Sequence, residues 1–126
     1  MILLFTMFAA HWFMDFAMQD EQDALNKHHS IKHLFFHVCQ YSSGMLIALL
    51  LYYLLCGAFN LVTPIYFMRF FFITFVLHFI TDYFTSKASN KKYKEGKFYG
   101  IIGFWSIIGF DQLLHNLQII LTLYYI

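Results

Sequence analysis

The sequence predicts an all-α integral membrane protein in which residues 1–126 form a single domain, a bundle of four transmembrane helices. Hydrophobic residues make up 60% of the chain and charged residues 12%, whereas a soluble domain carries about 25% charged residues. The apolar residues fall into four segments separated by polar or turn-forming connectors. Histidine and aspartate recur four residues apart inside these segments, where ionisable groups are expensive and need partners. We therefore expect a membrane bundle with a polar centre.

The first two apolar segments are joined by a polar connector. Residues 2–18 are just long enough to cross a thin hydrocarbon core. They begin without a basic region, and we expect them to be retained rather than cleaved as a signal peptide. Residues 19–30 form the connector, and the second segment, residues 31–56, carries His37 in its first turns.

The third and fourth segments are joined by a lysine-rich loop. Residues 57–64 form a short turn with the only proline of the chain, and residues 65–86 form the third segment. The loop at residues 87–97 carries five lysines. Residues 98–126 form the fourth segment, which is longer than one span needs. This order of segments predicts two antiparallel helical hairpins.

The lysines orient the predicted bundle. On the side opposite the first and third connectors, the only positive charges are Arg69 and the amino terminus. The positive-inside rule then places both connectors in the cytoplasm and both termini outside, in a multi-pass protein of the inner (cytoplasmic) membrane. The lysines on the cytoplasmic side are Lys27, Lys32, Lys87, Lys91, Lys92, Lys94 and Lys97.

Three histidine–aspartate pairs share a four-residue spacing, which places both members on one face of a helix. The pairs are His11 with Asp15, His78 with Asp82 and, in reverse order, Asp111 with His115. The first two pairs repeat the pattern His-aromatic-x-x-Asp-aromatic, once in each hairpin. Such a repeat would relate the two hairpins by a pseudo-twofold axis along the membrane normal.

Helix geometry predicts that the polar residues of the first three segments lie at similar depths. At about 1.5 Å per residue, Asp15 and Asp82 lie roughly 6 Å from the cytoplasmic boundary and His37 roughly 9 Å. The fourth segment reaches that level if it enters the membrane near Phe104. If it begins at Phe98 instead, the same rise per residue places its polar residues roughly 10 Å deeper in the membrane.

Imidazole and carboxylate groups on successive helix turns are typical of a metal site. Mixed nitrogen and oxygen ligands suit Zn²⁺ best, and also Mn²⁺ or Fe. Seven ligands exceed the needs of one tetrahedral zinc, but would suit two metals, or one metal with further carboxylates that orient the histidines. A divalent metal can supply a hydroxide nucleophile, and Asp111 is the candidate catalytic base. The candidate ligands are His11, Asp15, His37, His78, Asp82, Asp111 and His115.

Other interpretations of the polar residues stay open at this point. Intramembrane aspartates and histidines also form proton relays or ion paths, and they can simply lock helices together. We expect His28, His29 and His33, in or beside the solvated connector, to be non-ligands. Cys39 and Cys56 lack a CxxC spacing and are expected to be packed thiols.

A series of spaced motifs along nearly the whole chain carries a family resemblance. The motifs are His11, Asp15-Phe16 and Gln19; Asn26-Lys27; Leu34, His37-Val38 and Tyr41; His78-Phe79, Asp82-Tyr83 and Ser86-Lys87; and Asp111-Gln112-Leu113-Leu114-His115. In these motifs the chain resembles the small bacterial and phage membrane proteins grouped as DUF3307, whose function is unknown. The resemblance implies a shared site rather than a reaction. A looser similarity to YdjM-type membrane-bound metal-dependent hydrolases is an analogy of fold.

The sequence thus predicts an integral membrane metalloprotein, a metal-dependent hydrolase that acts near the cytoplasmic headgroup level. Its substrate would be a phospholipid, an isoprenoid phosphate or another amphiphile that enters from the leaflet. The alternative is a non-enzymatic membrane protein whose His/Asp cluster serves ion or proton passage or bundle stability. The expected partners are membrane lipid and a divalent metal, with no nucleic acid, and a homo-oligomer stays open.

Overall fold

The computed structural model describes the backbone of residues 1–18 and 21–126, and the side chains in these ranges except those of residues 23–25. Its regular structure is helical, with no strand in the described ranges, which confirms the predicted all-α class. Gln19, which belongs to the motifs named above, lies outside the described residues.

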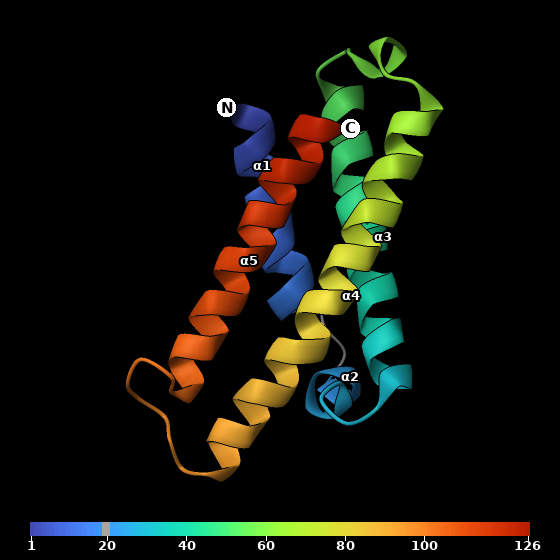
Figure 1. The fold of residues 1–126 in the computed structure, drawn as a ribbon. Coiled ribbons are helices and arrows are strands. Elements are labelled where there is room, and N and C mark those ends of the chain that lie inside the picture. The colour runs from blue at the N-terminus through green and yellow to red at the C-terminus, as the bar shows by residue number, and fades with distance from the viewer. Residues whose placement is uncertain (19–20) are drawn as a thin grey trace.

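Four bundle helices and one short connector helix make up the described chain (Figure 1). Helix α4 packs against α3 and α5, and α1 packs against the same two helices. Both termini lie at one end of the bundle, while α2 and the α4–α5 loop lie at the other (Figure 1). In chain order the elements are α1 (Ile2–Trp12), which continues as a π-helical segment (Phe13–Ala17), α2 (Glu21–Asn26), α3 (Ile31–Leu55), a 3-10 turn (Phe59–Leu61), α4 (Pro64–Lys94) and α5 (Phe104–Tyr125).

Glycines end the two longest helices. Gly57 after α3 and Gly96 after α4 adopt φ values of 66° and 67°, which only glycine reaches without strain. In each case the glycine N–H and the next N–H bond back to carbonyls of the last turn, at 3.0–3.1 Å. This is the Schellman arrangement, which satisfies carbonyls that the helix end leaves free.

The sequence left two starting points for the fourth helix, and α5 begins at the later one, Phe104. Gly100 has a φ of 98°, and the Gly103 N–H donates to the Gly100 carbonyl oxygen at 3.1 Å, forming a turn. The turn keeps residues 98–103 out of the helix. With this start, Asp111 reaches the level of the other histidine–aspartate pairs, as the depth argument requires.

The predicted end of the third helix was wrong. The lysine-rich stretch at residues 87–97 was expected to be a loop, but α4 continues through it to Lys94. No glycine or proline interrupts this stretch before Gly96, and lysines in a last turn interact favourably with the helix dipole. The polar connector between the first two segments contains the short helix α2.

The bundle has an apolar half and a polar half. Towards the termini the core consists of apolar side chains such as Met7, Met45, Leu49 and Phe70, none of which is exposed to solvent. Towards α2 the interior holds the histidines and aspartates. Of the described helices, α3 and α4 are long and apolar enough to cross a membrane.

Contrary to the prediction from the sequence, the first histidine–aspartate pair does not lie in one regular α-helix, because the π-helical segment begins between its two members. His11 lies in α1, whereas Asp15 lies in the wider turn that follows Trp12. The equivalent pair in α4, His78 and Asp82, lies in uninterrupted α-helix. Isolated π turns occur frequently at functional sites, and this one departs from the symmetry of the predicted repeat.

Candidate metal centre

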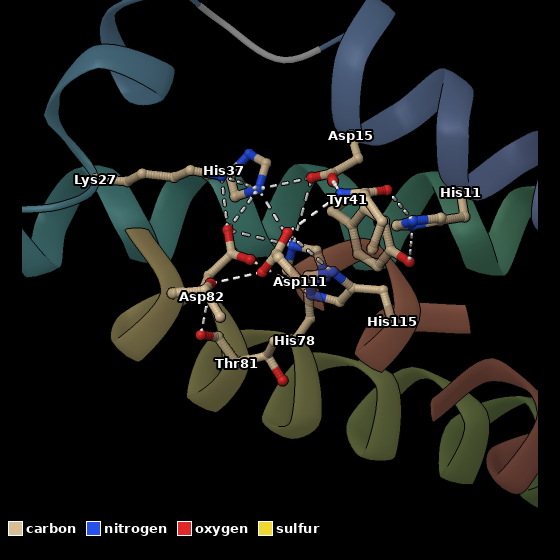
Figure 2. A network of polar contacts seen from close by, with 12 residues as sticks. His11, Asp15, Lys27, His37, Tyr41, His78, Thr81, Asp82, Asp111 and His115 are labelled. Atoms are coloured by element: carbon tan, nitrogen blue, oxygen red, sulfur yellow. Dashed lines mark hydrogen bonds and ion pairs between the residues drawn. The ribbon is translucent and has the colours of Figure 1, made fainter. Parts of the chain in front are cut away.

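The structure brings all seven predicted ligands together in the polar half of the bundle (Figure 2). All are buried except Asp111, whose side chain is 16% exposed. They come from every bundle helix, so the cluster exists only when the whole bundle is assembled. By element they are His11 in α1, Asp15 in the π-helical segment, His37 in α3, His78 and Asp82 in α4, and Asp111 and His115 in α5.

Four of these residues, Asp15, His37, His78 and Asp82, form a quartet around one point. The His37 Nε2 atom lies 3.3 Å from Asp15 Oδ1, 3.2 Å from Asp82 Oδ2 and 3.2 Å from His78 Nε2. A ring nitrogen carries at most one hydrogen to donate. These contacts therefore cannot all be hydrogen bonds that His37 Nε2 donates.

The spacing of the quartet fits a tetrahedral metal. With bonds of about 2.0–2.1 Å to nitrogen and oxygen, tetrahedral ligand atoms lie about 3.3–3.4 Å apart. His78 Nε2 lies 3.8 Å from Asp15 Oδ1 and 3.6 Å from Asp82 Oδ2. With the three contacts of His37, these separations span 3.2–3.8 Å. Two imidazoles and two carboxylates are a donor set that zinc, manganese and iron accept.

Unsatisfied polar atoms mark the same region. Among the described side chains, Asp15 Oδ1 and both ring nitrogens of His115 are buried without a hydrogen-bond partner. Asp15 Oδ1 is close to His37 Nε2 but lacks the alignment of a hydrogen bond. Buried polar atoms are nearly always bonded, so this oxygen supports a cation at the centre of the quartet.

The charge of the cluster also favours a divalent cation. Lys27, from the connector, places its Nζ 2.7 Å from Asp82 Oδ2 and 3.5 Å from His37 Nε2. Burial alone would lower the pKa of Lys27, but the carboxylates of Asp82 and Asp15 outweigh burial and raise that pKa above its ordinary value. With neutral imidazoles, the carboxylates of Asp15, Asp82 and Asp111 and the single ammonium leave two negative charges, which one divalent cation would neutralise.

Gln112 links three members of the cluster. Its Oε1 accepts from His11 Nε2 at 2.9 Å, and its Nε2 donates to Asp15 Oδ2 at 3.0 Å and to Asp111 Oδ2 at 3.2 Å. His11 Nδ1 in turn accepts from the Tyr41 hydroxyl at 2.9 Å. Both His11 nitrogens thus have partners, so His11 supports the ligands here rather than facing the quartet.

Tyr41 positions a second histidine through its ring. The ring stacks on the His78 imidazole with centroids 3.8 Å apart and an interplanar angle of 16°. Tyr41 is itself almost fully buried. Tyr41 therefore acts on two histidines. Its ring packs against the face of the His78 imidazole. Its hydroxyl donates to His11 Nδ1, so the hydrogen of the neutral His11 ring is on Nε2.

A cavity of about 470 Å³ lies beside the cluster, between α4, α5 and the connector. Asp15, Asp82 and Asp111 line it, together with polar groups such as Lys27 and Ser86. Phe104, Ile107 and Ile108 form an apolar part of its wall. A molecule in this cavity would reach the oxygen ligands of the quartet.

The structure also locates residues to which the sequence gave no site role. Lys27 was counted only as a topological charge and a member of a motif, and Tyr41 and Gln112 only as members of motifs. Their roles depend on contacts between different helices, which spacing along the chain does not show. His28, His29 and His33 belong to none of the groups of metal-ligand atoms found among the described residues, although His28 lines the cavity.

Comparisons of the chain with family models, with curated proteins and with solved structures find no match. The resemblance to DUF3307 proteins therefore stays a prediction from the motifs.

The contacts of Tyr41 predict the effect of removing its hydroxyl. Tyr41→Phe keeps the stack on His78 but leaves His11 Nδ1 buried without a donor, which should cost about 1–3 kcal/mol. The matched control is Tyr53→Phe, because the Tyr53 hydroxyl meets that of Tyr66 at 3.3 Å in a partly buried site. Thermal unfolding in detergent should show the larger loss for Tyr41→Phe, and equal losses would contradict the network.

Proposed function

We propose that this protein is an integral membrane metalloprotein of four spans, a hydrolase that acts on a lipid-like or phosphate-bearing amphiphile. The observation that carries the proposal is the quartet of Asp15, His37, His78 and Asp82, in which the donor-atom separations that involve the two histidines span 3.2–3.8 Å, near those of a tetrahedral metal site. With neutral imidazoles the cluster carries two surplus negative charges, which a divalent cation would neutralise, and the donor set suits zinc first, with manganese or iron as alternatives.

The membrane arrangement draws on the shape of the bundle. Helices α3 and α4 have the length and hydropathy of membrane spans. Helix α5 has 22 residues, about 33 Å at the usual rise, and the apolar helix at residues 2–17 packs beside it. The lysine-rich end of α4 and the connector share one end of the bundle (Figure 1). In the proposed topology this end is cytoplasmic and both termini lie outside.

The cavity supports an amphiphilic substrate. Its polar side presents Lys27 and Ser86, whose Oγ is buried without a hydrogen-bond partner among the described residues. Its apolar side presents Phe104, Ile107 and Ile108. A phosphate group near the ammonium and a hydrocarbon chain against the apolar wall would bring the bond to be cleaved to the oxygen ligands of the quartet.

Asp111 is the proposed catalytic carboxylate. It lies in the cavity wall, where Thr85 Oγ1 donates to Oδ1 and Gln112 Nε2 donates to Oδ2. A bound divalent metal would supply the acidity that makes water a nucleophile near neutral pH. Asp111 then takes the proton of the attacking water and returns it to the departing oxygen, so the proton count of the hydrolysis balances.

The apolar half of the bundle argues against an ion or proton path. Next to the cluster on the side of the termini, a space of about 10 Å³ adjoins His78, His115 and Thr122, which is at the lower limit for one water molecule. Beyond it lie Met7 and Phe70, which are fully buried. Thr74, Gln118 and Thr122 line the small space with polar groups, but the apolar side chains beyond it would interrupt a conducting path, so we favour the hydrolase.

Metal binding should stabilise the bundle, because the ligands come from separate helices. At a metal concentration 100 times its Kd, the free energy of unfolding should rise by about 2.7 kcal/mol. His78→Ala should abolish this rise and the bound metal, whereas His29→Ala, an exposed connector residue, should keep both. Metal analysis and thermal unfolding of the chelator-stripped, zinc-repleted protein in detergent test this. Equal metal content in wild type and His78→Ala would refute the quartet.

Asp111→Asn should separate turnover from the metal of the quartet. The amide cannot take a proton from water, so turnover should fall about 10²–10⁴-fold, while the quartet keeps its metal. The measurement is release of phosphate or fatty acid from an isoprenyl phosphate and a phospholipid in mixed micelles, with zinc-loaded protein. Wild-type turnover in Asp111→Asn would remove the catalytic role of this residue.

A further inference from the structure

The quartet poses a chemical problem for a hydrolase. Its four protein ligands complete a tetrahedral shell, and closed four-ligand sites are typical of structural metals, whereas catalytic metals keep an open position. The quartet side chains are also buried, with His37, His78 and Asp82 each only 1% exposed. The proposed chemistry needs a metal position that is nearer to the cavity and has fewer protein ligands.

We propose that Asp82, Asp111 and His115 hold a second divalent cation, which shares the Asp82 carboxylate with the first and faces the cavity. One donor atom from each of the three residues lies within 4.8 Å of the others. Asp82 Oδ2 belongs to the quartet, while its Oδ1 lies 3.4 Å from His115 Nε2. A carboxylate with one oxygen towards each position is a natural bridge, and metals in two-metal hydrolytic sites lie about 3.5–4 Å apart.

His115 gives independent support for this second position. It is 1% exposed, and neither of its ring nitrogens has a hydrogen-bond partner among the described residues. Asp111 Oδ2 approaches its Nδ1 at 3.5 Å, again without the alignment of a hydrogen bond. A fully buried imidazole with two unsatisfied nitrogens is costly, and a cation bound to one of them removes part of that cost.

A competing group of donors is less suitable. His11, Asp15 and His115 also bring donor atoms within 4.8 Å of one another. However, both nitrogens of His11 are bonded, to Tyr41 and to Gln112, at 2.9 Å each. A metal there would have to displace one of these partners, whereas the position at Asp82, Asp111 and His115 displaces no hydrogen bond of His115.

The second position leaves room for the reaction. Three protein ligands leave an open site, and Asp111 and Asp82 line the cavity. The first metal balances the two surplus negative charges, so a second brings two positive charges to the cavity wall. An anionic group would offset them, which is a reason for this site to prefer a phosphate-bearing substrate. This inference rests on the proposed function and on the first metal in the quartet.

Metal stoichiometry tests the second site in the full chain in detergent. After stripping with chelator, titration with Mn²⁺ should load two ions per chain, and inorganic phosphate should tighten the weaker step. His115→Gln and Asp111→Asn should each lower the content from two to one, and His29→Ala should keep two. Electron paramagnetic resonance should show a spin-coupled manganese pair in wild type and isolated manganese in the two variants, a readout that a folding defect alone would not produce.

Each other outcome has a distinct meaning. One ion in wild type that persists in His115→Gln would overturn the second site and leave the quartet intact. No ion in wild type would overturn both positions. Two ions in both variants, or the loss of both ions from variants that circular dichroism shows to be helical, would refute the assignment to Asp82, Asp111 and His115.

Discussion

The arrangement of this protein depends on placing two buried carboxylates and a partly exposed third beside four buried imidazoles at one level of an apolar bundle. Taking such charges out of water costs several kcal/mol per ion unless other groups compensate. Lys27 compensates for one of the carboxylates, with its ammonium 2.7 Å from Asp82. With neutral imidazoles two negative charges remain, which a divalent cation would neutralise, and the quartet is the group of donors that could hold it.

The rest of the fold serves this constraint. The glycine turn before Phe104 sets the level at which Asp111 and His115 enter the cluster. The connector carries Lys27 back over the bundle end, where it meets Asp82 across 55 positions of sequence. Gln112 and Tyr41 then fix the orientations of the ligands, as groups that surround metal ligands commonly do. The apolar half towards the termini closes the site on its other side.

Much of the site could be predicted because helix periodicity is regular. A spacing of four residues places His78 and Asp82 on one face, and a rise of about 1.5 Å per residue sets their depth. The roles of Tyr41 and Gln112 could not be predicted, because they depend on which rotamers meet across helix interfaces. Periodicity also could not reveal the π turn at Asp15. The end of α4 was predicted too early, because the lysines of residues 87–97 were interpreted as a sign of a loop. Lysines are compatible with a helix, and α4 continues through them to Lys94, just before Gly96.

X-ray absorption on the zinc-loaded protein tests the central claim most directly, because it reports the atoms bound to the metal. A metal in the quartet should show nitrogen and oxygen ligands at about 2.0–2.1 Å, outer-shell scattering from imidazole rings, and no sulfur. In His37→Ala the imidazole contribution should fall. A sulfur ligand, or a shell of oxygen alone without imidazole scattering in the wild type, would contradict a metal held between Asp15, His37, His78 and Asp82.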